Sequence, residues 1–131
     1  MKIAVCVAEN CGITFNGRRV SRDKKILEDM ISLFGRVEVG ESAFGMFERA
    51  GLAEGASVCA EENPDGALFI EKDPAEYYGR AGTAVIYRFN VNYPADVYMT
   101  SSPADNGFTL VSVTEFTGET HEKITREVYS K

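Results

Sequence analysis

The sequence predicts an α+β domain built on a mixed β-sheet, and three patterns lead to that class. Residues 2–8 form an apolar run, residues 21–35 have the periodicity of an amphipathic helix, and β-rich runs follow residue 66. The chain has 131 residues, of which 44% are apolar, so it is able to bury a core of its own. Without a linker or repeat to divide it, we expect one domain over residues 1–131.

The N-terminal segment predicts a central strand followed by a hairpin. After Lys2, residues 3–8 are apolar at odd and even positions alike, which is typical of a strand buried on both faces. Asn16-Gly17 then separates two short β-rich runs, and this dipeptide favours the two positive φ angles of a tight hairpin turn.

Two helices are expected in the first half of the chain. Ser21 is a good N-cap, Gly35 is a good helix end, and apolar residues between them recur on one helical face. A short strand over residues 37–39 should precede a second helix, which Ser42 would cap and Gly51 would end.

The second half is rich in strands and ends in a predicted helix. The β-rich runs are separated by Gly, Pro and Asn clusters, and they cover residues 57–60, 67–71, 84–90, 97–100 and 108–116. Residues 119–129 carry three oppositely charged pairs at i,i+4 spacing, which predicts a C-terminal helix. This order of elements favours an α+β domain, with a three-layer α/β sandwich as the alternative.

The charge pattern excludes several kinds of partner. The net charge is −6, and residues 41–80 hold nine acidic against three basic side chains. Such a chain is unsuited to generic nucleic-acid binding, which relies on a basic surface. Its apolar runs are too short to span a membrane. Its three cysteines are an odd number without CxxC spacing, which favours a cytoplasmic protein.

A basic segment at residues 18–25 is the clearest candidate binding surface. It holds five cations and one anion at the hairpin return and the start of the first helix. Guanidinium groups beside helical N–H groups can bind an anion such as phosphate, and a solvated charged surface is the alternative interpretation. Arg88 lies in an otherwise apolar strand, where it should pair with Asp96 or join this site. The predicted anion site therefore comprises Arg18, Arg19, Arg22 and Arg88.

His121 is the single histidine and the candidate general base. It would lie in the first turn of the predicted last helix, where it could equally be a packed histidine. Cys6 should be an inert core thiol, and Cys11 in a turn a more exposed one. A zinc site joining these thiols to Cys59 and His121 has unsuitable spacing, so we predict no metal and no cofactor.

Three stretches are similar to a group of short, uncharacterised bacterial proteins, some of which are automatically labelled ribonuclease Z. The stretches are KIAVCVAEN-CGITFNGRRVSRD, YRFNVNYPADVY and EFTGETHEKITREVY. Ribonuclease Z uses an HxHxDH zinc motif with further metal ligands on a larger fold. A chain whose one histidine is His121 does not provide that motif, so the resemblance implies no activity.

These patterns predict a small cytoplasmic protein without catalytic activity, which binds a small anionic ligand or a protein partner through the basic segment. The alternative is a small hydrolase or phosphodiesterase-like enzyme. It would use His121 as base and an arginine clamp from Arg18, Arg19 or Arg88. A homodimer is left open, because a strand-rich chain has sheet edges that can pair.

Overall fold

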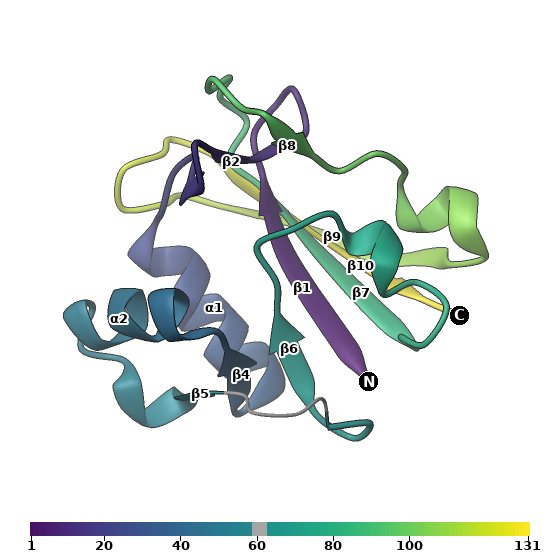
Figure 1. The fold of residues 1–131 in the computed structure, drawn as a ribbon, viewed down its shortest axis with the longest axis horizontal. Coiled ribbons are helices and arrows are strands. Elements are labelled where there is room, and N and C mark those ends of the chain that lie inside the picture. The colour runs from purple at the N-terminus through teal and green to yellow at the C-terminus, as the bar shows by residue number, and fades with distance from the viewer. Residues whose placement is uncertain (59–62) are drawn as a thin grey trace.

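The computed structural model describes residues 1–58 and 63–131 (Figure 1). Its helical elements are α1 (Lys24–Phe34), α2 (Glu41–Arg49), and the 3-10 turns η1 (Ala53–Gly55), η2 (Pro74–Glu76) and η3 (Pro103–Asn106). Its strands are β1 (Lys2–Val7), β2 (Gly12–Phe15), β3 (Arg18–Arg19), β4 (Val37–Val39), β5 (Ala56–Val58), β6 (Ala67–Phe69), β7 (Thr83–Arg88), β8 (Val97–Tyr98), β9 (Thr109–Phe116) and β10 (Ile124–Ser130).

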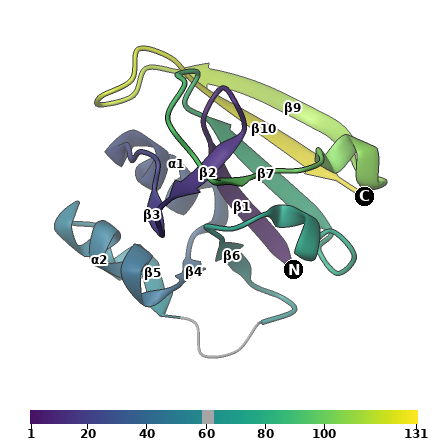
Figure 2. The ribbon, with the colours of Figure 1, turned by 45° about the horizontal axis from the view of Figure 1, so that its top comes forward.

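Seven strands form one mixed sheet in the order β5-β4-β6-β1-β7-β10-β9. β1 pairs in parallel with both β6 and β7, so the N-terminal strand is central, as predicted. β10 runs antiparallel to β7, and β9 runs antiparallel to β10 as an exposed edge strand. A second sheet, in the order β3-β2-β8, lies beyond the end of β1 (Figure 2).

The two faces of the large sheet are covered differently. Both α1 and α2 lie on one face, where their apolar side chains pack with alternate residues of β1, β4 and β7 (Figure 1). Turn η2 and residues near β8 and η3 cover the other face. Within the described part of the chain, no helix is long and apolar enough to cross a bilayer.

The structure confirms the α+β class, the mixed sheet and two helices in the first half. The hairpin turn is also confirmed, because Asn16 and Gly17 have φ angles of 51° and 74°. The bounds of β6, β7, β8 and β9 agree with the runs predicted for them to within two residues. The run predicted at 57–60 overlaps β5, and its last two residues, Cys59 and Ala60, lie outside the described residues.

The predicted C-terminal helix over residues 119–129 is wrong, because most of this segment belongs to β10. Its charged side chains pair across the sheet or with α1 and not along a helix. Lys123 Nζ lies 3.0 Å from Glu115 of β9, and Arg126 lies 2.9 Å from Asp29 of α1. Pairing with β7 and β9 on both sides outweighs the weak local helix preference of these residues.

Candidate functional site

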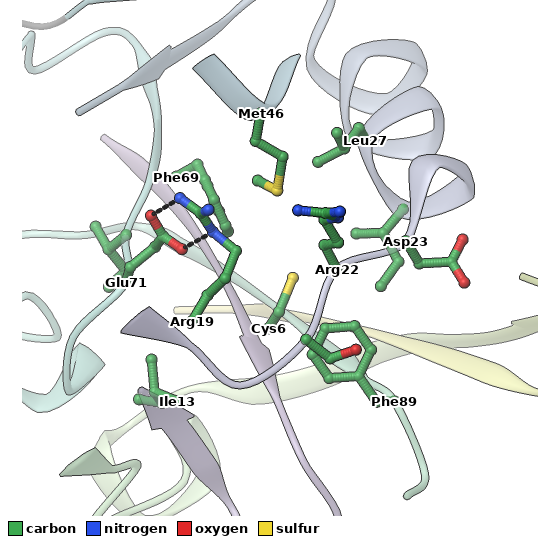
Figure 3. Close-up of a pocket in the computed structure, with 13 residues that line it drawn as sticks. Cys6, Ile13, Arg19, Arg22, Asp23, Leu27, Met46, Phe69, Glu71 and Phe89 are labelled. Carbon is green, nitrogen blue, oxygen red and sulfur yellow. Dashed lines mark hydrogen bonds and ion pairs between the residues drawn. The ribbon is translucent and has the colours of Figure 1, made fainter. Parts of the chain in front are cut away.

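A pocket lies outside the carboxyl ends of β1, β6 and β7. The chain leaves β1 toward α1 on one face of the sheet, whereas it leaves the adjacent β6 toward η2 on the other face. Parallel neighbours whose connections diverge in this way leave a crevice at their ends, where α/β proteins bind their ligands. The loop before α1 forms the outer wall of this crevice (Figure 3).

We call this pocket the slot. Its free volume of about 20 Å³ holds about one water molecule, so it is closed to a larger ligand. The walls are mostly apolar and come from both helices, from four strands and from the segments that follow them. The apolar lining residues are Ile13, Ile26, Leu27, Met46, Phe69, Ile70 and Phe89, and the polar ones are Cys6, Arg19, Ser21, Arg22, Asp23 and Glu71.

An ion pair between Arg19 and Glu71 bridges two walls of the slot (Figure 3). Arg19 Nε donates to Glu71 Oε2 at 2.7 Å, and a second guanidinium nitrogen donates to Oε1 at 3.0 Å. The same guanidinium donates to the Ser42 hydroxyl at 3.1 Å. Because Arg19 belongs to β3 and Glu71 follows β6, this bidentate pair closes the slot between them.

A larger cleft adjoins the slot, with a free volume of about 450 Å³. The two share Arg22, Asp23, Leu27 and Met46, so they lie side by side. The cleft adds Lys24, Arg49, Ala50, Glu119 and Thr120. Its three cations have no ion-pair partner in the described part of the chain. A chain of net charge −6 therefore carries, beside its slot, a cleft with these three unpaired cations and the carboxylates of Asp23 and Glu119.

Asp23 is the buried centre of this region. It is the N-cap of α1, a role that the sequence analysis wrongly gave to Ser21, and its side chain accepts from the Lys25 N–H at 2.9 Å. It also accepts from the Glu119 and Thr120 N–H groups at 2.8 and 3.0 Å. Burial opposes ionisation, but these hydrogen bonds and that of His121 hold the pKa of Asp23 below its usual value.

His121 lies in the loop before β10, where it is buried against Asp23. The prediction that it lies in the first turn of a helix is therefore wrong. Its Nδ1 lies 2.9 Å from Asp23 Oδ2, and its ring stacks on Phe89 with centroids 4.8 Å apart. On the other side, Nε2 lies 2.8 Å from the Tyr93 hydroxyl and 3.2 Å from the Ser21 hydroxyl. The sequence did not connect Ser21 or Tyr93 with His121, because they lie 100 and 28 residues from it.

The four arginines of the predicted anion site do not converge. Arg19 and Arg22 line the slot, whereas Arg18 is exposed at the hairpin. Arg88 follows Ala84 and Ile86 on the opposite face of the sheet, so it lies behind the slot. It pairs with Glu127 at 2.9 Å and not with Asp96, because β7 pairs with β10 instead of β8.

The cysteines and the candidate metal-ligating residues give the slot no further reactive group among the residues that the structure describes. Burial raises the pKa of the Cys6 thiol far above its usual value, so this wall of the slot is chemically inert. Cys59 lies outside the described residues. Among the residues that the structure describes, no group of His, Cys, Asp and Glu is arranged to hold a metal ion.

Comparison with known proteins identifies the fold. No family model and no curated protein sequence matches the chain. Among solved structures, it is similar to dihydrofolate reductase from Enterococcus faecalis, complexed with NADP(H) and RAB-propyl, with a TM-score of 0.67. The match has 13% identity and covers 99% of this chain and 95% of that chain. The protein therefore has the fold of dihydrofolate reductase.

This match corrects the functional prediction. We predicted a non-catalytic binding or interaction protein, but the fold that the chain shares along its whole length is an enzyme fold. The hydrolase alternative, with His121 and an arginine clamp, finds no support in this match, and Arg88 lies on the other face of the sheet.

The described residues do not fit the phosphates of a dinucleotide such as NADP(H). The pyrophosphate of a dinucleotide binds at the free N–H groups of a helix N-terminus. Carboxylates occupy these places here, since Asp23 caps α1 and Asp73 caps η2. α2 begins after the uncapped Gly40, but Glu41 is its first residue and the Arg19–Glu71 pair lies at its Ser42. No hydride-transfer step is therefore assigned to this chain.

Proposed function

We propose that the protein is an enzyme that acts on a small anionic molecule with an apolar body. The body would enter the slot and the anionic group would lie in the cleft. The observation that carries this proposal is that a mostly apolar slot at the carboxyl ends of the strands adjoins a cleft with three cations that are unpaired among the described residues. The enzyme fold of the similar structure supports it.

Each part of the site would make a different contribution. The aromatic and aliphatic walls, among them Phe69 and Phe89, would bind the body of the ligand by apolar burial. Arg22 lies where the slot meets the cleft, so its guanidinium would bind a carboxylate or phosphate there. Lys24 and Arg49 would add attraction that weakens with salt.

The slot must open before such a ligand enters, and the Arg19–Glu71 pair is the part that opens. Both side chains are about one-fifth exposed, at 19% and 24%. Separating a partly exposed ion pair costs on the order of 1 kcal/mol, which the burial of one ring offsets. The closed slot is thus compatible with a substrate site.

Binding of dihydrofolate, inorganic phosphate and NADPH, each followed by amide shifts in NMR, tests this proposal. We expect dihydrofolate or phosphate to shift the amides of Arg22, Lys24 and Arg49, and Arg22→Ala to weaken that binding about tenfold. Arg18→Ala is the matched control, because Arg18 is exposed outside both cavities. Absence of shifts in the cleft with all three probes at millimolar concentration would contradict the proposal.

Glu71→Gln should strengthen the binding of the same probe several-fold. The substitution weakens the pair that closes the slot and frees the Arg19 guanidinium for an anion. Glu127→Gln is the matched control, since it weakens the Arg88–Glu127 pair on the opposite face. Isothermal titration of the three proteins measures the effect, and equal affinities would show that the pair does not limit access.

We further propose that the protein works in the cytoplasm. The odd number of cysteines supports this compartment. Cys6 and Cys11 form no disulfide with each other in the part of the chain that the structure describes. Labelling of the intact protein with a thiol reagent directly after lysis would test it, since Cys11 should be found unoxidised.

A further inference from the structure

Among the hydroxyl groups that contact the buried histidine, that of Ser21 lines the slot, whereas that of Thr120, 3.1 Å from Nδ1, lines the cleft. His121 and Asp23 have side-chain exposures of 2% and 0%, so the pair is sealed from solvent. The Ser21 hydroxyl lies 3.2 Å from His121 Nε2, and Ser21 lines the slot. The Tyr93 hydroxyl contacts the same nitrogen at 2.8 Å, but Tyr93 does not line the slot.

The hydrogen bonds fix which ring nitrogen exchanges its proton. Asp23 accepts from three backbone N–H groups in addition to the ring, so it remains a carboxylate and Nδ1 carries a proton. In the neutral ring, Nε2 is then the acceptor for a hydroxyl group. In the cationic ring, Nε2–H donates to the same hydroxyl oxygens. The network therefore holds either one or two ring protons without a change of partners.

We propose that Ser21 and His121 form a proton relay into the slot, with Asp23 as the positioning residue. The cationic His121 passes its Nε2 proton to Ser21 Oγ, and Ser21 passes its hydroxyl proton to a basic atom of the molecule in the slot. The substrate gains one proton and His121 becomes neutral; the reverse sequence removes one proton from a substrate. This inference rests on the proposed function, because it places acid–base chemistry in the same substrate site.

A purely structural role for these residues makes a different prediction. Asp23 and His121 join the loop at residues 118–121 to the start of α1, and they would stabilise this contact without moving a proton. In that case, loss of the Ser21 hydroxyl would leave proton exchange at the ring unchanged. It would accelerate exchange if the contact loosened. A relay through Ser21 predicts instead that loss of this hydroxyl slows the exchange of the ring proton.

The test is the rate at which the imidazole protons exchange with water, measured by NMR on ligand-free protein with ¹⁵N-labelled histidine. His121 is the only histidine in the sequence, so its signals need no further assignment. The titratable groups that face the ring are Asp23 and Tyr93. We expect Ser21→Ala to slow the exchange about tenfold or more, and Ser21→Thr to restore it, because threonine keeps the hydroxyl.

Tyr93→Phe is the matched variant, since it removes the other hydroxyl at the same nitrogen. The relay predicts that Tyr93→Phe slows exchange less than Ser21→Ala. Unchanged or faster exchange in a folded Ser21→Ala protein would overturn the proposal. The proposal would also be overturned if Tyr93→Phe slowed the exchange as much as Ser21→Ala. Because no ligand is present, a negative result here is independent of whether the probes of the proposed function bind.

Discussion

Asp23→Ala should lower the free energy of unfolding by about 3 to 5 kcal/mol, a large fraction of the stability of a domain of this size. The substitution removes the N-cap of α1 and leaves the N–H groups of Glu119 and Thr120 without their acceptor. It also removes the partner of His121. Urea unfolding followed by circular dichroism measures the change.

Two further variants keep this prediction testable if the alanine protein does not fold. Asp23→Asn retains one carbonyl acceptor, so we expect a smaller loss of about 1 to 2 kcal/mol. Asp73→Ala is the matched control, because Asp73 also caps a helical turn but is half-buried, with the Thr100 hydroxyl as a further donor. It should cost about 1 to 2 kcal/mol. Equal losses in the free energy of unfolding for Asp23→Ala and Asp73→Ala would contradict the inference that burial makes Asp23 the more important cap.

The stability of the wild-type protein should fall on acidification, in part through Asp23. Its folded-state pKa is lowered, whereas an unfolded aspartate has a pKa of about 3.9. The carboxylate therefore contributes its full stabilisation above the unfolded value and loses it as the pH falls toward the folded value. Unfolding measured at a series of pH values should show the difference between wild type and Asp23→Ala shrinking in acid. A constant difference would exclude this linkage.

Local patterns in the sequence predicted the elements whose cause is local. Residues 3–8 are apolar on both faces, and Asn16-Gly17 favours positive φ, so the central strand and the hairpin were both found. The segment at 119–129 was misassigned because its i,i+4 charges are compatible with a helix. In the structure, those charges have partners on β9 and α1. Nothing in the segment itself indicates those partners.

The candidate site depends on contacts between distant residues, and this is why the sequence showed only parts of it. Arg19 and Arg22 were chosen from their local charge, and both line the slot. Glu71, which closes the slot with Arg19, lies 52 residues away. In the sequence it is one of the nine acidic side chains in residues 41–80. His121 was chosen for its chemistry, but its partner Asp23 lies 98 residues away. Sequence identified the reactive groups, and topology decided which of them meet.

Gly118→Ala should destabilise the protein by about 2 to 3 kcal/mol, although Gly118 lies in a loop. A Cβ at this position would lie 2.9 Å from Asp23 Cγ and 3.0 Å from the His121 carbonyl oxygen, and closer still to one carboxylate oxygen. Asp23 cannot move aside without losing its bonds to backbone N–H groups, and the His121 carbonyl accepts from the Gly118 N–H at 2.9 Å. The added methyl group must therefore separate the loop from α1.

Gly79→Ala is the matched control for this prediction, because a Cβ there meets no atom within 4 Å. We expect it to change the free energy of unfolding by less than about 0.5 kcal/mol. The relay adds a second consequence, since displacement of Asp23 removes the positioning of the His121 ring. Gly118→Ala should therefore also change the NMR signals of His121, whereas Gly79→Ala leaves them unaltered. A Gly118→Ala protein with wild-type stability and an unshifted His121 would show that the loop at 118–121 adjusts freely, and that Asp23 does not fix its position.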